Sequence, residues 1–167
     1  PDILGYFNDP AYRYVYIFAH GDQFSFGPHN NPPTMISERE IQRVTTNILS
    51  TVRPIACHPF KFVWIDGCET AQGAMCEAFG IPSGQYYNAY FNLVNKRSRA
   101  FLGAYEKFGI SYNVMDTRRA EMLSRFWNYW LQNYELWQCC TNAAAYTPEP
   151  LKSWRIHGAT NLTIQTF

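Results

Sequence analysis

YVYIFAHGD at residues 14–22 decides the fold together with a second stretch, FVWIDGCET at residues 62–70. Both begin with a short apolar run rich in aromatic and β-branched residues, which is typical of a buried strand. The first run is followed by His20 and the second by Cys68, two side chains that can take part in catalysis. Because chemistry collects at the carboxyl ends of strands in an open α/β sheet, we expect a base and a thiol nucleophile at one sheet edge.

A helix is predicted between these two strands, over residues 37–52. Ser37 and Glu40 match the capping box, in which each side chain binds a backbone N–H at the start of a helix. Apolar residues then recur at helical spacing, namely Ile41, Val44, Ile48 and Val52. Strand, helix and strand form a βαβ unit, whose two parallel strands end at the same edge of the sheet.

The remaining sequence continues the alternation of strands and helices. Further strands are predicted at residues 100–104, 154–157 and 162–165, and further helices at residues 69–79, from Asp116 onward, and at residues 135–146. Gly80 is expected to end the first of these helices and Asp116 to cap the second. The second has an apolar face made of Ala120, Leu123, Trp127, Trp130 and Leu131. Polar loops are predicted at residues 22–35 and 83–98. The pattern favours one α/β domain over residues 1–167, with a mostly parallel sheet flanked by helices.

Composition excludes several classes of function. The chain has 167 residues, 47% of them apolar and 17% aromatic, with a formal net charge of +1. Nothing in that charge points to nucleic acid or to an anionic membrane, and no apolar stretch reaches the length of a membrane span. The chain begins Pro1-Asp2-Ile3, without Met or a signal peptide, which indicates a processed piece or a fragment of a longer protein.

Cysteine spacing gives no sign of a metal site. The five cysteines are Cys57, Cys68, Cys76, Cys139 and Cys140, and none forms the CxxC pair that zinc sites use. Cys57 and His58 are adjacent, but no second pair of ligands accompanies them. We therefore expect no metal and no organic cofactor, and cysteine usage favours a reducing compartment such as the cytoplasm.

The expected pairing of His20 with Cys68 is suited to acyl transfer. A free thiol has a pKa of about 8.5, and the dipole of a helix starting at Glu69, together with a protonated imidazole, would lower it. Gly21 lets the backbone approach a substrate closely. The backbone N–H groups of Gly21 and Cys68 would then bind the oxyanion of a tetrahedral intermediate.

At this point the sequence resembles the caspase-like cysteine peptidases of clan CD, and most closely the bacterial CHAT-type and gingipain-like members. The His lies about 50 residues before the Cys, as in that family. The residues that carry the resemblance occur in the same order as in the family: His20-Gly21, Cys68-Glu69-Thr70-Ala71, Ala100-Phe101-Leu102-Gly103, Asn142-Ala143-Ala144-Ala145 and the closing WRIHGATNLTI of residues 154–164. The resemblance spans roughly residues 10–166.

The resemblance implies a cysteine endopeptidase that acts on a peptide or protein with a Cys68–His20 dyad, as the output of a larger assembly with a regulatory segment or partner. Two features depart from the family pattern. The caspase signature QACxG is replaced by IDGCET. The family also has two strands before the His strand, and these are expected to be missing here or to lie on another segment.

Further roles are implied by the same resemblance. In metacaspases and clostripain an Asp two residues before the Cys helps to form an S1 pocket for Arg or Lys, and Asp66 holds that position. Asp66 could instead be an acid that binds local backbone at the end of a strand, and this alternative stays open. Asp22, which lies next to the predicted dyad, is either a residue at the edge of the site without a role in binding or a residue that contacts the substrate. The basic cluster Lys96, Arg97 and Arg99 lies where several relatives cleave themselves.

Two alternatives remain. Cys68, Asp116 and His157 occur in the order of an α/β-hydrolase triad, but that fold needs glycines where this chain has Asp66 and Thr70. The domain could also be a caspase-like recognition or scaffold module without activity.

Overall fold

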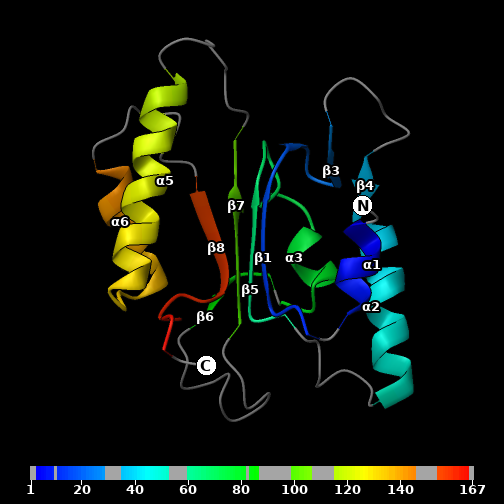
Figure 1. Ribbon diagram of the computed structural model, residues 1–167. Coiled ribbons are helices and arrows are strands. Elements are labelled where there is room, and N and C mark those ends of the chain that lie inside the picture. The colour runs from blue at the N-terminus through cyan, green and yellow to red at the C-terminus, as the bar shows by residue number, and fades with distance from the viewer. Residues whose placement is uncertain are drawn as a thin grey trace.

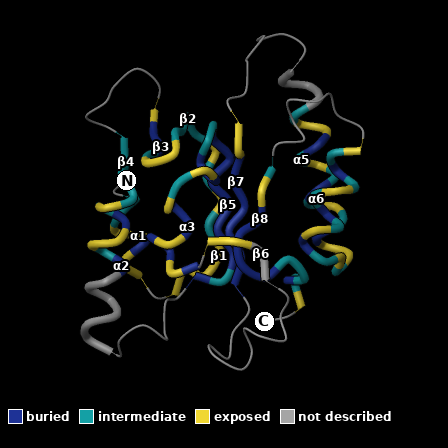
Figure 2. Tube along the Cα trace, turned by 180° about the vertical axis from the view of Figure 1, so that it is seen from behind, coloured by how far each residue is buried: buried dark blue, intermediate teal, exposed yellow. Residues whose placement is uncertain are grey.

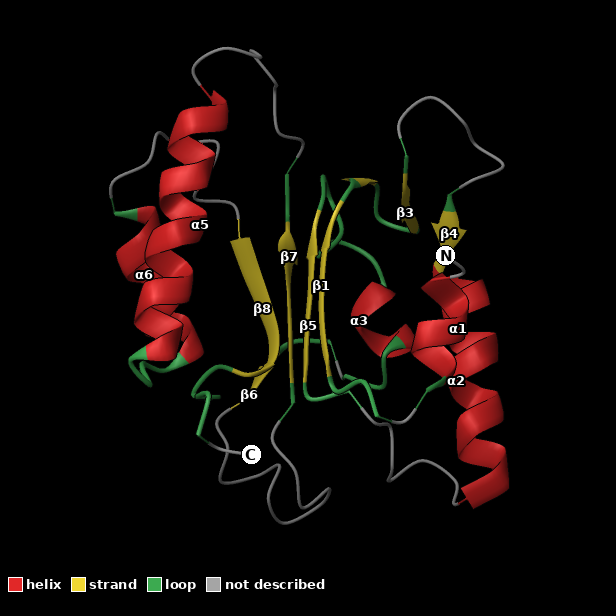
Figure 3. Ribbon diagram, in the orientation of Figure 1, coloured by secondary structure: helices red, strands yellow, loops and turns green. Residues whose placement is uncertain are grey.

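A five-stranded sheet lies between two layers of helices (Figures 1 and 3). The computed structural model describes residues 3–9, 11–28, 35–52, 60–81, 83–86, 99–106, 115–145 and 154–165. The strands of the sheet, in spatial order, are β1 (Tyr14–Phe18), β5 (Phe62–Asp66), β7 (Ala100–Ala104), β8 (Trp154–Ala159) and β6 (Gln85–Tyr86).

The sheet is mostly parallel, as predicted. β1 pairs parallel to β5, β5 parallel to β7, and β6 parallel to β8, whereas β7 and β8 are antiparallel. A second, smaller antiparallel sheet contains β2 (His20–Gly21), β3 (Ser25–Gly27) and β4 (Ile36–Ser37).

Helices cover both faces of the large sheet (Figure 1). α1 (Ile3–Asn8), α2 (Glu38–Val52) and α3 (Met75–Ala78) lie on one side, and α5 (Met115–Leu131) and α6 (Leu136–Ala144) lie on the other. Because both faces are covered, the central strands are apolar throughout instead of alternating with polar residues. The sequence therefore contains the continuous run FVWI.

The core is divided by the sheet into two clusters. Phe62 and Trp64 of β5 pack with Phe126 and Trp130 of α5 on one face. The intervening residues Val63 and Ile65 belong to the other cluster, with residues of α1, α2 and α3. Every residue of β5 is buried, as the dark central strands in Figure 2 illustrate. Burying a side chain of this size contributes roughly 1.5–3 kcal/mol to the stability of the fold. The loops at the edge of the sheet are therefore attached to strands that the core holds in place.

Two of the three predicted capping signals are confirmed, those of Ser37–Glu40 and of Gly80. The Glu40 carboxylate accepts the Ser37 N–H at 2.9 Å, and the Ser37 hydroxyl accepts the Glu40 N–H at 3.3 Å. Gly80 has φ 69° and follows the C-cap of α3. Ile81 N–H donates to the Cys76 carbonyl at 3.0 Å, which is the Schellman arrangement at a helix end.

The helix predicted over residues 69–79 is wrong. Turns and bends occupy residues 67–74, and only Met75–Ala78 form the short helix α3. Glu69 has φ 56°, in the left-handed region that a continuous right-handed helix excludes. Cys68 therefore does not lie at a helix N-terminus, and Glu69 is not an acid in a first helical turn.

Other boundaries also differ from the predictions. The predicted loop of residues 22–35 contains β3, and Asp116 lies inside α5 and not before it. No strand forms at residues 162–165, because that segment caps α6. The carbonyls of Thr160 and Leu162 accept the N–H groups of Trp137 and Leu136, at 3.0 and 2.8 Å, which a helix start leaves without internal partners.

The apolar face of α5 is also shifted from its predicted position. Met122, Phe126 and Trp130, spaced four residues apart, are buried against the sheet, whereas Leu131 is 70% exposed. Among the helices of the described segments, each is too short or too polar to cross a lipid bilayer.

Candidate active site

His20 and Cys68 follow two adjacent strands at the same edge of the large sheet. β1 and β5 are parallel, with Phe18 opposite Asp66, and the Ala19 N–H donates to the Asp66 carbonyl at 3.4 Å. Each of the two predicted catalytic residues comes two positions after this last pair. Both are half-buried. The strand pairing therefore places the two turns that carry them side by side.

His20 lies in β2, at the start of a hairpin. It pairs with Gly27 of β3, and Gly21 pairs with Phe26. The Asp22 carboxylate closes the hairpin turn, since it accepts the N–H groups of Phe24 and Ser25 at 2.7 Å each and the Ser25 hydroxyl at 3.0 Å. Asp22 thus has a structural task at this rim, and its contact with a substrate stays a prediction.

Gly21 is where the two turns touch. A Cβ at this position would lie 2.5 Å from Cγ2 of Thr70, 3.0 Å from the Cys68 carbonyl oxygen and 3.5 Å from the Cys68 nitrogen. No side chain fits there, which explains why glycine must follow His20. Because the sequence carries this glycine, the His20 segment can lie directly against the Cys68 turn.

The N–H of Gly21 points away from the hairpin. Asp22 N–H donates to the Ser25 carbonyl at 2.9 Å, so these two residues form a hydrogen-bonded pair. Pairs alternate along an antiparallel ladder, and Gly21 with Phe26 is therefore a pair without mutual hydrogen bonds. The two N–H groups predicted to hold an oxyanion, those of Gly21 and Cys68, thus belong to adjoining segments.

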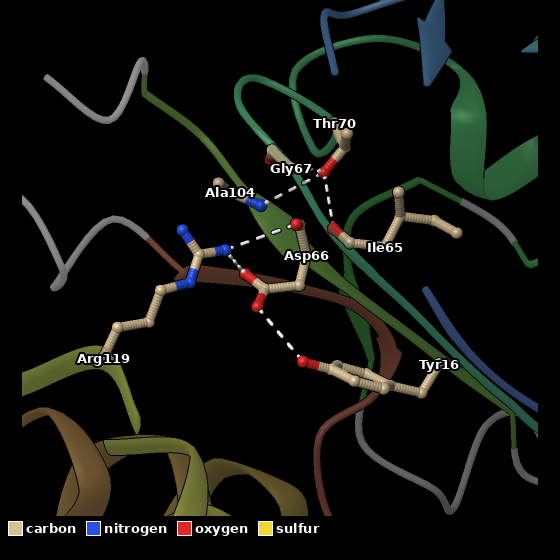
Figure 4. Close-up of polar contacts among 7 residues, drawn as sticks. All are labelled: Tyr16, Ile65, Asp66, Gly67, Thr70, Ala104 and Arg119. Carbon is tan, nitrogen blue, oxygen red and sulfur yellow. Dashed lines mark hydrogen bonds and ion pairs between the residues drawn. The ribbon is translucent and has the colours of Figure 1, made fainter. Parts of the chain in front are cut away.

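Thr70 fixes the Cys68 turn (Figure 4). Its side chain is fully buried, and its Oγ1 lies 2.8 Å from the Ile65 carbonyl and 3.0 Å from the Gly67 carbonyl. The same oxygen accepts the Ala104 N–H at 3.3 Å, and the Ala71 N–H donates to the Ala104 carbonyl at 2.8 Å. The turn is therefore held by one hydroxyl and by the end of β7, and not by a following helix.

Asp66 is buried in an ion pair beside this turn (Figure 4). Its side chain is 1% exposed, and Oδ1 accepts from Nη2 of Arg119 at 2.5 Å. The Tyr16 hydroxyl donates to Oδ2 at 3.3 Å. Burial raises the pKa of Asp66, and the hydrogen bonds from Arg119 and Tyr16 offset that effect only in part. A basic substrate side chain would therefore meet an Asp66 that already has a cation.

The described cysteines differ in their surroundings. Burial raises the pKa of Cys76 and Cys139 to about 12, and that of Cys140 well above its usual value. Cys139 is fully buried in the core. Those three thiols stay protonated at neutral pH and are poor nucleophiles. Cys57 and His58 lie outside the described residues.

His157 is occupied by backbone contacts. Its Nδ1 accepts the Gly84 N–H at 2.8 Å, and its Nε2 lies 2.9 Å from the Ala71 carbonyl, to which it donates. With both ring nitrogens bonded in this way, the imidazole has no nitrogen left for a nucleophile. This arrangement argues against the α/β-hydrolase triad, and the side chain of Asp116 lies outside the described residues.

The structure gives no support to the predicted self-cleavage cluster. Lys96 and Arg97 lie outside the described residues, and Arg99 is 5% exposed, which is unlike an accessible cleavage point. In the part of the chain that the structure describes, no three His, Cys, Asp or Glu side chains gather as metal ligands would.

Arg119 and Tyr16 were not predicted as site residues. A signal for Arg119 exists, because it lies three residues before Met122 and so continues the buried stripe of α5 with a charged residue. A charge in such a stripe indicates a buried ion pair. Comparison with protein-family models, with curated proteins and with solved structures found no match to this chain.

Proposed function

We propose that this protein is a cysteine endopeptidase of the caspase-like kind. Cys68 Sγ attacks the scissile carbonyl carbon, and the C–N bond of the resulting tetrahedral intermediate then breaks to leave a thioester. His20 takes the proton of the Cys68 thiol and delivers it to the leaving amine. A water molecule then hydrolyses the thioester and returns the thiol. The N–H groups of Gly21 and Cys68 stabilise the oxyanion in both steps.

The observation that carries this proposal is the contact between Gly21 and the Cys68 turn. The residue after the predicted base lies within van der Waals reach of the nucleophile's own backbone, although the two are far apart in the sequence. This contact supports the proposal, because it brings the segments of His20 and Cys68, with their backbone N–H groups, together at one edge of the sheet. Acyl transfer needs a base, a thiol and two backbone donors together.

Peptide hydrolysis tests the proposal. A panel of fluorogenic peptides with Arg, Lys, Asp, Asn or Leu at P1 should reveal turnover that C68A and H20A each abolish. C140A serves as the matched control, since it removes a thiol of α6 and should leave turnover unchanged. A peptidyl electrophile should also label Cys68 faster than Cys76 or Cys139, as followed by mass spectrometry. Equal labelling of all thiols, together with no turnover of any peptide, would refute the proposed peptidase activity.

A recognition domain without activity is the second candidate, and one observation favours it. β1 lies at the edge of the large sheet, and its outward residues Tyr14, Tyr16 and Phe18 are 46%, 41% and 66% exposed. Of these, Tyr14 and Tyr16 line an apolar groove of about 560 Å³ together with Trp127 and Leu131. Exposed apolar surface of this kind marks interaction sites. If C68A binds a partner as wild type does and no variant turns over peptide, this candidate is the correct one.

The proposal also covers the compartment, the substrate and the control of the enzyme. Cys76, Cys139 and Cys140 are thiols and not disulfides, and a nucleophilic thiol must stay reduced. We therefore place the enzyme in a reducing compartment such as the cytoplasm. Its substrate is a peptide or protein, and a regulatory segment or partner subunit controls it.

A further inference from the structure

The last residue pair shared by β1 and β5 is bridged by a side chain of α5. Phe18 of β1 lies opposite Asp66 of β5 in the strand register. The guanidinium carbon of Arg119 lies 4.6 Å from the centre of the Phe18 ring, and its Nη2 donates to Oδ1 of Asp66 at 2.5 Å. Figure 4 shows how the guanidinium faces Asp66. Arg119 therefore contacts both members of the pair, and Phe18 and Asp66 each stand two positions before a proposed catalytic residue.

We propose that Arg119 is a positioning residue, which holds His20 against the Cys68 turn by joining the ends of β1 and β5. The inference rests on the proposed peptidase activity, because that activity requires His20 and Cys68 to act together. Arg119 acts through the residues that precede these two side chains along the chain, and so adds a member to the site that the proposed mechanism does not name.

The carbonyl oxygen of Asp66 is the point where the two strand ends and Arg119 meet. It accepts the Ala19 N–H at 3.4 Å and Nη2 of Arg119 at 3.3 Å. A carbonyl oxygen has a lone pair for each of these bonds. The bond from Ala19, the residue directly before His20, is longer than the usual range of about 2.7–3.2 Å. Backbone pairing alone therefore holds His20 weakly, and the contacts of Arg119 add attachment where that pairing ends.

Side chains on one face of β1 add to this attachment. Tyr16 and Phe18 are two residues apart and so lie on the same face of the strand. The Tyr16 hydroxyl donates to Oδ2 of Asp66 at 3.3 Å, and the Phe18 ring lies against the guanidinium of Arg119. In the described sheet β1 is an edge strand with β5 as its one neighbour. The end of β1 therefore depends on these side-chain contacts more than the end of β5 does.

Arg119 is itself held in a fixed direction. It lies three residues before Met122, which is buried against the sheet with Phe126 and Trp130 of the same helix. Residues three apart share a helix face, so the guanidinium projects from α5 toward the end of the sheet. The Arg119 side chain is 15% exposed and that of Asp66 is 1% exposed. Leaving this buried carboxylate without its cation carries a large desolvation penalty, so the bridge stays in place.

Thr70 and Arg119 have different tasks at this edge of the sheet. Oγ1 of Thr70 accepts the Ala104 N–H at 3.3 Å and so ties the Cys68 turn to β7. Arg119 joins β5 to β1, the strand that leads to His20. The proposed nucleophile is thus placed from one neighbour of β5, and the proposed base from the other.

Peptide turnover gives the first measurement. F18L removes the ring against which Arg119 lies and changes no charge, and because Phe18 is 66% exposed this variant should fold. Its kcat should fall by about threefold, the size of one exposed cation–π contact. The KM should stay near that of wild type, because the contact serves the chemical step and not substrate binding.

Variants of the arginine itself extend this measurement. R119A should lower kcat by about 10- to 100-fold, as expected for a misplaced reacting group. R119K keeps the cation without the planar fork, and should recover part of that loss. R155A is the matched control, because it removes an arginine that lies 3.7 Å from the Tyr105 ring and belongs to β8; its kcat should equal that of wild type.

The pH profile of Cys68 labelling by iodoacetamide gives a measurement that a purely structural role would not move. H20A should raise the pH of half-maximal labelling, because the thiolate loses the cation that stabilises it. F18L should raise this pH by at least half as much. Because F18L leaves every charge near the turn in place, its shift reports the position of His20. A wild-type profile in F18L and in folded R119A would overturn the proposal.

The positioning role and the peptidase activity fail separately. If wild type cleaves peptide while F18L and folded R119A keep its kcat and its labelling profile, the positioning role fails and the peptidase stands. If neither wild type nor any variant cleaves peptide, but F18L and H20A shift the labelling profile in the same direction, the peptidase proposal fails and the positioning role stands.

Discussion

Gly21 and Thr70 are in contact across the two turns that carry the proposed catalytic residues, since a Cβ on Gly21 would lie 2.5 Å from Cγ2 of Thr70. Thr70 is fully buried and β-branched, so it cannot move aside. The glycine after the histidine and the threonine after the cysteine therefore fit each other as a pair. This contact determines how closely the two turns approach.

Alanine at Gly21 should separate the turns. We expect G21A to lose about 1–3 kcal/mol of unfolding free energy through overpacking, measured by urea denaturation. Peptide turnover and the labelling of Cys68 should fall together. G5A is the matched control, because Gly5 is an exposed residue of α1 where alanine favours the helix. Unchanged turnover in G21A would show that the close approach is not needed.

Removing the Thr70 hydroxyl should loosen the Cys68 turn. Valine has the same shape but leaves the Ala104 N–H and the carbonyls of Ile65 and Gly67 without this partner. T70V should therefore cost about 1–3 kcal/mol of unfolding free energy, whereas T70S should retain most of it. The rate at which a peptidyl electrophile labels Cys68 should fall in T70V only. Equal labelling rates in the two variants would assign the role to packing and not to the hydrogen bonds.

Glu40 should stabilise the start of α2 in a pH-dependent way. Its hydrogen bonds with Ser37 hold the pKa of Glu40 below its usual value of 4.5. The stabilisation is therefore present above that usual value and is lost as the pH falls through the lowered pKa of the folded protein. E40Q keeps the hydrogen bond and removes the charge, so its deficit should be about 0.5 kcal/mol near pH 7 and vanish near pH 2. E121Q, on an exposed position of α5, is the control; a deficit for E40Q that grows in acid would contradict this account.

Asp66 should show the opposite pH dependence. Because burial raises the pKa of Asp66, the folded protein binds this proton more tightly than the unfolded chain does. Its contribution to the unfolding free energy is fully present below the usual pKa and is lost as the pH rises through the raised one. Wild type should therefore lose stability relative to D66N between about pH 4 and the raised pKa, in urea titrations. A relative gain over that range would mean that Arg119 outweighs burial.

Most of the strands could be predicted from sequence, whereas the Cys68 turn could not. The run at residues 62–66 is apolar on both faces, which only a strand covered by helices on both sides explains. Residues 69–79 read equally well as a helix, because the tertiary contacts that bend them are invisible in the chain. One hydroxyl of Thr70 and the end of β7 impose a left-handed Glu69, and no local propensity contains that information.

The proposed functional residues divide in the same way. His20 and Cys68 are recognisable because each lies two positions beyond the end of an apolar strand, and Gly21 because it follows His20. Arg119 is distant from Asp66 in the sequence and meets it only because α5 packs across the end of β5. The role of Asp66 depends on that meeting, since a carboxylate at a strand end is exposed or buried according to what covers it.

By itself, the sequence determined that strands and helices alternate, that the sheet is mostly parallel, and that His20 and Cys68 follow two of its strands. These properties depend on local periodicity and on where apolar runs stop. The tertiary structure alone decided what surrounds Cys68: a turn fixed by Thr70 in place of a helix dipole, and an Asp66 paired with Arg119. The reason is physical, because burial and ion pairing depend on which distant segments share a dry interior, and sequence spacing does not record that.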